Sequence, residues 1–158
     1  MPSRRPPRRR FRSIAPLPVL LPSASVSADR LALILPVPPS INHQYATVNG
    51  RRILSSAGRR YKEEVGRIVL LGLACSPHRD VLLQVLRSHY LALSMRFRFP
   101  SPLRRDVDGG LKITQDALCE ALGLNDSRVF EIHLYKNVST DSPGVEISLG
   151  PTAHGKIG

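Results

Sequence analysis

This sequence has few cysteines and no long apolar run, which argues against a cysteine framework and against a transmembrane helix. The two cysteines, Cys75 and Cys119, lie far apart and have no CxxC spacing. This pattern argues against a disulfide or zinc framework and favours buried thiols in a reducing compartment. No run of about 18 apolar residues occurs, so no transmembrane helix is expected. At 158 residues, the chain is long enough for one domain with a substantial core.

Acidic residues are also scarce. The chain has 12 Asp and Glu residues against 23 Lys and Arg residues, and its net charge is +11. Such an excess attracts polyanions, of which nucleic acid is the commonest. Charge alone does not separate a nucleic-acid enzyme from a basic binding or structural protein.

The basic residues are concentrated at the N-terminus. Residues 1–28 contain six arginines and no acid, and they are rich in proline. This composition predicts a disordered basic arm. The segment superficially resembles a signal peptide, but Pro16, Pro18 and Pro22 interrupt its apolar stretch, and an organelle transit peptide is an open alternative. Without the arm, 17 basic and 12 acidic residues remain.

Hydrophobic periodicity predicts an α/β (α+β) fold over residues 29–150, with one mixed β-sheet and two main helices packed on it. Residues 151–158 are predicted to form a flexible tail. Strands are expected at 31–35, 45–48, 51–54, 91–99, 130–134 and 145–149. Helices are expected at about 56–75 and 109–122. Residues 80–89 are ambiguous between strand and helix. Asn49-Gly50 predicts a hairpin turn between two of the strands.

Three aspartates fall where the chain is expected to turn: Asp106, Asp108 and Asp126. In an extended segment, the spacing of the first two places both carboxylates on one side. A divalent cation removes the repulsion between them, and Mg²⁺ prefers oxygen ligands. Asp126 could join them if its turn lies beside the same sheet edge. The cluster would then hold Mg²⁺, activate water and hydrolyse a phosphodiester.

Basic side chains near these acids are candidates for handling phosphate. Lys112 would lie one helical turn after Asp108 and could neutralise charge on the reacting phosphate. Asp116 falls on the same face and is expected to support Lys112 rather than bind metal. The candidate phosphate contacts are all arginines: Arg51, Arg52, Arg59, Arg60, Arg104 and Arg105.

Each of these residues also has a simpler structural explanation. Asp108 is a suitable N-cap, and Asp108 with Lys112 has the spacing of an ordinary surface ion pair. Asp126 could satisfy backbone donors in its turn. The histidines have no HxxxH or HxH arrangement, and no G-x-S-x-G motif occurs. Zinc chemistry and serine hydrolysis are therefore disfavoured.

The order of four motifs along the chain is more specific than any one of them: LPVPPSIN at 35–42, SSAGRRYKEEV at 55–65, RRDVDGGLK at 104–112 and QDALCEALGLNDSRV at 115–129. Together they resemble the RusA-type Holliday-junction resolvases over about residues 31–138. The resemblance implies Mg²⁺-dependent cleavage of four-way DNA junctions by a symmetric homodimer.

The resemblance also assigns roles residue by residue. The family's metal-binding aspartates fall on Asp106, Asp108 and Asp126, and its lysine falls on Lys112. The Asn of its proline-rich loop falls on Asn42, which becomes a candidate contact to nucleic acid.

One position departs from the family pattern. The family usually has Asn after its second Asp, whereas this chain has Gly109 followed by Gly110. Two glycines weaken a helix start, so they are expected to lower efficiency without changing the reaction class.

The sequence therefore favours a metal-dependent crossover junction endodeoxyribonuclease of recombination and repair, in a bacterial or phage-infected cytoplasm. It is expected to need no membrane and no small-molecule cofactor. The alternative is a non-catalytic basic nucleic-acid-binding protein, such as an inactive resolvase relative.

Overall fold

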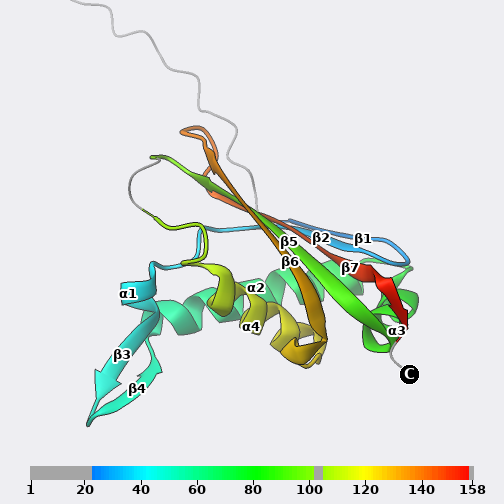
Figure 1. Cartoon of the computed structure of the whole chain (residues 1–158), viewed down its shortest axis with the longest axis horizontal. Coiled ribbons are helices and arrows are strands. Elements are labelled where there is room, and N and C mark those ends of the chain that lie inside the picture. Colours follow the sequence, from blue (N-terminus) through cyan, green and yellow to red (C-terminus); the bar gives the residue numbers. More distant parts are fainter. Residues whose placement is uncertain (1–22, 102–104, 157–158) are drawn as a thin grey trace, which may run out of the picture.

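A computed structural model describes residues 23–101 and 105–156 (Figure 1). These residues form a five-stranded sheet in the order β1-β2-β7-β5-β6. Its strands are β1 (Ser23–Val26), β2 (Leu31–Leu35), β5 (His89–Phe99), β6 (Val129–Val138) and β7 (Gly144–Lys156). β5 and β6 are parallel and the other neighbours are antiparallel, so the predicted mixed sheet is confirmed.

The helices of the described chain gather on one face of this sheet (Figure 1). They are α1 (Ile41–Gln44), α2 (Ser56–Ala74), α3 (Arg79–Ser88) and α4 (Leu111–Leu122), with a 3₁₀ turn η1 (Asp126–Arg128) after the last. α2 and α4 are the two main helices that the periodicity predicted. α4 also supplies the crossover that parallel β5 and β6 require. The ambiguous segment 80–89 is mostly helical, in α3.

The core lies between the sheet and the two main helices. Alternate residues of β5 are buried against the helices: Leu91, Leu93, Met95, Phe97 and Phe99. Burying one such side chain contributes roughly 1.5–3 kcal/mol. Between the helices, the Tyr61 hydroxyl and Thr114 Oγ1 lie 3.0 Å apart in a buried hydrogen bond. Burial raises the pKa of Tyr61, so this phenol remains neutral.

Local chemistry fixes the start of α2 and the end of α4. Ser55 Oγ accepts a hydrogen bond from the Gly58 amide at 3.0 Å and caps α2. Gly123 ends α4 with a left-handed φ of 63°. Helical spacing predicts that Leu111, Gln115, Leu118 and Leu122 form the inner stripe of α4. This is partly wrong, because Leu118 and Leu122 are buried but Leu111 and Gln115 are only half-buried. α4 is covered by α2 as well as by the sheet, and it therefore buries a wider arc.

Ordered structure extends beyond the predicted domain at both ends. β1 lies inside the segment assigned to a disordered arm, and β7 continues to Lys156 through the predicted tail. β1 is ordered because it pairs with β2 and packs on α2, where a Cβ at Gly72 would lie 2.3 Å from Ala24 Cβ. The remainder of the predicted arm, residues 1–22, lies outside the described residues.

A separate two-stranded hairpin projects from the body beside α1 (Figure 1). β3 (Tyr45–Val48) and β4 (Arg51–Leu54) match the predicted strands. Asn49 and Gly50 have φ values of 49° and 73°, as a tight turn between twisted strands requires.

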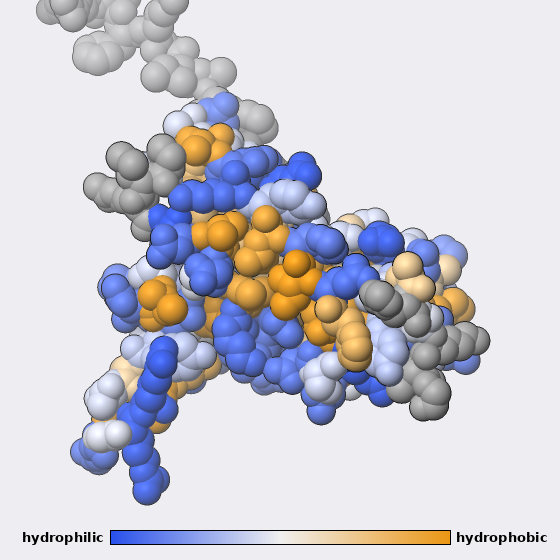
Figure 2. Space-filling model, viewed as in Figure 1, coloured by the Kyte–Doolittle hydropathy of each residue, from blue (hydrophilic) through white to orange (hydrophobic). Residues whose placement is uncertain are grey.

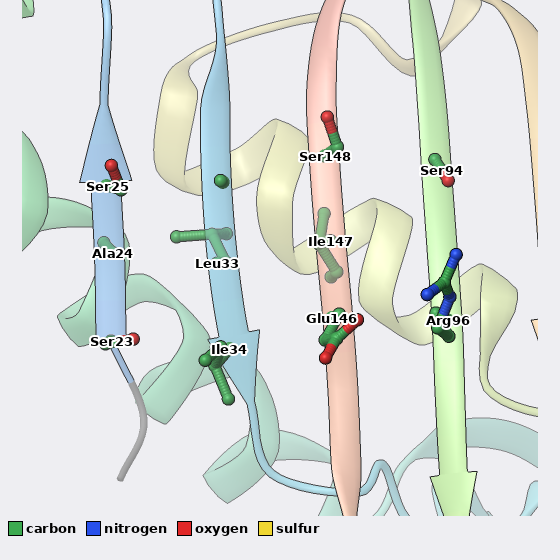
Figure 3. A pocket seen from close by; sticks show the side chains of 11 residues that line it. Ser23, Ala24, Ser25, Leu33, Ile34, Ser94, Arg96, Glu146, Ile147 and Ser148 are labelled. Carbon is green, nitrogen blue, oxygen red and sulfur yellow. The ribbon is translucent and has the colours of Figure 1, made fainter. Parts of the chain in front are cut away.

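The outer face of the sheet has a hollow of about 460 Å³ over β1, β2, β7 and β5 (Figure 3). Small side chains such as Ser25 and Ser94 leave it open. Glu146 is the acid in its lining, and Arg98 Nη2 holds that carboxylate at 2.7 Å. Because the hollow lacks a second carboxylate, it offers no paired acids for hydrolysis. Within the described ranges, no helix is long and apolar enough to cross a membrane.

The two cysteines differ in exposure. Cys119 is buried in α4, as expected, but Cys75 is exposed where the chain leaves α2. Burial, together with the negative charges of Asp126 and Asp116, raises the pKa of Cys119 to about 11. We expect a thiol reagent at pH 8 to modify Cys75 in the folded protein and Cys119 only in urea, as measured by mass spectrometry. Equal rates without urea would contradict this packing.

Candidate active site

The two closely spaced aspartates lie on the turn that leads into α4. The Gly109 amide donates to the Asp106 carbonyl at 3.3 Å, and the Leu111 amide donates to the Asp108 carbonyl at 3.0 Å. Both aspartate side chains are exposed. With Asn42, they line one hollow of about 280 Å³. The acidic pair therefore shares a single accessible site with the residue of the proline-rich loop.

That site is held together by contacts between the proline-rich loop (residues 36–40) and the turn that carries the two aspartates (residues 106–110, the aspartate turn). The side-chain amide of Gln44 donates to the carbonyl oxygens of Pro39 at 2.9 Å and Gly109 at 2.7 Å. Arg105 also donates to the Pro38 carbonyl. Gln44 is only 2% exposed, so water cannot readily replace these bonds. Sequence reasoning missed Gln44, because no motif or periodicity marks a polar residue in a four-residue helix.

The two glycines of the turn have different surroundings. A Cβ at Gly110 would lie 2.5 Å from Pro38 Cγ and 2.9 Å from Phe97 Cε1. A Cβ at Gly109 would meet the Asp106 carbonyl oxygen at an ordinary 3.5 Å. Gly110 is therefore required by close packing, whereas the position where the family usually has Asn has room for a side chain.

Lys112 lies in a second charged cluster. Its ammonium is 2.7 Å from Asp116 Oδ1 and 3.0 Å from Asp126 Oδ2. α4 starts at Leu111, so Asp108 lies in the preceding turn rather than in a helix with Lys112. The expectation that Asp116 supports Lys112 is confirmed. Hydrogen bonds to Asp116 and then to Asp126 raise the pKa of Lys112. The side chain is therefore an ammonium throughout the neutral range.

The donor set fits a hard cation at the first cluster. Mg²⁺ commonly uses one or two carboxylates and completes its shell with water and phosphate oxygens. Asp106 and Asp108 supply two exposed carboxylates beside the Asn42 amide. In the described part of the chain, no three His, Cys, Asp or Glu residues are grouped as a metal site. Asp126 is instead paired with Lys112.

Basic side chains lie around the acidic pair. Lys136, which sequence reasoning also missed, donates to the Arg105 carbonyl at 2.6 Å. Four of the predicted phosphate contacts are exposed, on the hairpin and on the first turns of α2: Arg51, Arg52, Arg59 and Arg60. Arg104 lies outside the described residues. A polyanion reaching the acidic pair would therefore meet positive charge.

Carboxylates on a loop between a strand and a helix, inside a basic surface, are typical of metal-dependent enzymes that act on nucleic-acid phosphates. The family model described as Endodeoxyribonuclease RusA matches residues 36–150, and the chain belongs to this family.

Curated relatives agree with the family model. The chain is 27% identical over 119 residues to the crossover junction endodeoxyribonuclease RusA of Escherichia coli strain K12, covering 75% of this chain and 92% of the relative. It is also 27% identical over 118 residues to the protein of that name from Enterobacteria phage 82, covering 74% and 91%.

Lys112 provides a first test of the site. The predicted role of Lys112 is to place a positive charge near the reacting phosphate, so we expect Lys112→Gln to slow DNA cleavage by about 10- to 100-fold. Lys112→Arg should retain more activity than Lys112→Gln. Lys62→Gln is the matched control, since Lys62 also pairs with a carboxylate of α4, that of Glu120. Equal single-turnover rates for Lys112→Gln and the control would exclude a role in cleavage.

Proposed function

We propose that this protein is a Mg²⁺-dependent endonuclease that hydrolyses DNA phosphodiesters at four-way junctions, in recombination and repair. The observation that carries the proposal is the pair Asp106 and Asp108, lining one accessible hollow beside Arg105. The relatives support the substrate, because they are named crossover junction endodeoxyribonucleases.

Asp106 and Asp108 would hold Mg²⁺, which when bound supplies an activated water and stabilises the leaving oxygen. The chain's own residues perform the remaining tasks. Gln44 and Arg105 hold the aspartate turn against the proline-rich loop, so the carboxylates are positioned before DNA arrives. Asp126 remains a predicted third ligand. Its ion pair with Lys112 couples that acid to the ammonium that would neutralise phosphate charge.

The nuclease is proposed to act as a homodimer, because a junction has approximate twofold symmetry and needs two related cuts. The edge strand β6 is a suitable surface for a second copy. Phe130, Ile132 and Val138 are exposed on it, and hydrophobic side chains gather over this strand in Figure 2. An unpaired apolar edge of this kind is ordinarily covered in the working assembly.

The test is cleavage of a labelled synthetic four-way junction beside a linear duplex of the same arm sequences, with Mg²⁺ and with excess chelator. We expect paired symmetric nicks in the junction, Mg²⁺ dependence and little cleavage of the duplex. Junction binding without cleavage by the folded protein would instead identify a non-catalytic binder. Equal binding to both DNAs without cleavage would identify a structural basic protein.

A further inference from the structure

The β3–β4 hairpin is held apart from the main sheet and presents two different faces. Residues paired across the strands share a face. On one face, the guanidinium of the exposed Arg52 lies 4.1 Å from the ring centroid of the half-buried Tyr45. The other face carries exposed side chains: Ala46, Val48, Arg51 and Ile53. Val48 is 47% exposed and Ile53 is 43% exposed.

A hairpin of two short strands is only marginally stable alone, so it needs contacts at its base to keep its shape. The Ser55 amide donates to the Gln44 carbonyl at 2.9 Å, and the Ser55 hydroxyl donates to the His43 carbonyl. The Gln44 side chain in turn donates to Gly109 beside the acidic pair. The buried residue Gln44 therefore holds both the hairpin and the aspartate turn. Four residues per strand carry the hairpin roughly 13 Å outward.

The charge around the hairpin indicates what covers its apolar face. No Asp or Glu occurs from Arg30 to Lys62, while arginines lie at the hairpin tip and on the first turns of α2. A protein partner would need an acidic surface around an apolar patch, whereas DNA offers phosphates beside the apolar faces of its bases. The hairpin is also attached, through Gln44, beside the proposed cleavage site. Nucleic acid is therefore the occupant that the charge favours.

We propose that the hairpin is a wedge that enters the branch point of a DNA junction. This inference rests on the proposed function and adds to it an element that recognises the branch. Val48 and Ile53 would pack against bases that have lost a stacking neighbour, and Arg51 and Arg52 would hold the adjacent phosphates. Apolar wedges enter DNA where stacking is weakest, and stacking is already interrupted at a branch point.

The double variant Val48→Thr/Ile53→Thr tests the wedge while keeping β-branched residues in both strands. We expect junction affinity to fall about tenfold, as loss of stacking contacts with bases would cause, and duplex affinity to change less than twofold. Because no charge is removed, the salt dependence of binding should stay as in the wild type. A 2-aminopurine at the branch point should brighten with wild-type protein and much less with the variant.

The matched control is Leu70→Thr/Val81→Thr, which changes two similarly exposed aliphatic residues on α2 and α3. It should bind both DNAs as the wild type does. Arg51→Gln/Arg52→Gln should instead weaken junction and duplex binding together and reduce the salt dependence, since phosphate contacts are lost.

Three results would overturn the wedge. In the first, Val48→Thr/Ile53→Thr has the junction affinity and the 2-aminopurine signal of the wild type, and the wild type cleaves junctions. That result would leave the proposed function intact. Another is loss of self-association in that variant, which would identify a second copy as the occupant. The third is a wild-type protein that neither binds nor cleaves junctions, which overturns the proposed function and the wedge together.

Discussion

Asp108→Asn should lower junction cleavage by at least about a hundredfold, because the proposed task of Asp108, holding Mg²⁺, is electrostatic and needs the negative charge. The change removes one negative charge from a hollow that Asp106 also lines, and an amide is a much weaker ligand for Mg²⁺. Junction binding should be retained and become slightly tighter at low salt, since repulsion from the phosphates is reduced. Single-turnover cleavage and fluorescence polarisation measure the two effects separately.

Asp80→Asn is the control for this variant, because Asp80 is exposed in the first turn of α3, which lies at the opposite end of the sheet from the start of α4 (Figure 1). It should cleave as the wild type does. If Asp108→Asn cleaves at the wild-type rate, the acidic pair is not the catalytic centre. If it loses binding as severely as cleavage, the aspartate has a structural role instead.

Gly110→Ala should reduce the free energy of unfolding by about 1–3 kcal/mol, the usual cost of forcing extra volume into a packed site. The new methyl would overlap Pro38, and the ring of Phe97 behind it is fully buried and cannot move freely. Urea denaturation followed by circular dichroism measures the loss. Cleavage should fall as well, since relief of the overlap moves the turn that carries Asp108.

Gly109→Ala is the matched control, because the added methyl finds only ordinary contact with the Asp106 carbonyl. Its stability should differ from the wild type by less than about 0.5 kcal/mol, as for an ordinary surface change. Equal urea midpoints for the two variants would mean that Pro38 moves away from the added methyl group at little cost in free energy. The close packing of Gly110 would then not be what fixes the turn.

Local sequence patterns determined much of this protein. β5 alternates because one face of a strand is buried, and β2 reads as an apolar run. Asn49-Gly50 specifies the hairpin, since both residues tolerate positive φ, and Ser55 specifies the start of α2. Each of these signals acts within a few residues, so no knowledge of distant contacts is required.

The spacing of Asp106 and Asp108 also predicted that the two carboxylates lie together, and both residues line one hollow. Spacing also predicted that Asp116 supports Lys112, and their ion pair is present. The ion pair of Lys112 with Asp126 was not predicted, because Asp126 lies beyond the end of α4 and reaches the ammonium only after the chain has folded back.

Tertiary structure alone decided the features that depend on distant segments. Gln44 acquires its role because the proline-rich loop and the aspartate turn, 65 residues apart along the chain, lie side by side. Segment 23–26 becomes a strand because it pairs with β2 and packs on α2, and Cys75 is exposed because no other element covers the end of α2 within the described residues. Burial and pairing of this kind depend on which surfaces meet after folding. Periodicity, capping and turn chemistry are instead properties of the local chain, and so they could be read before the fold was known.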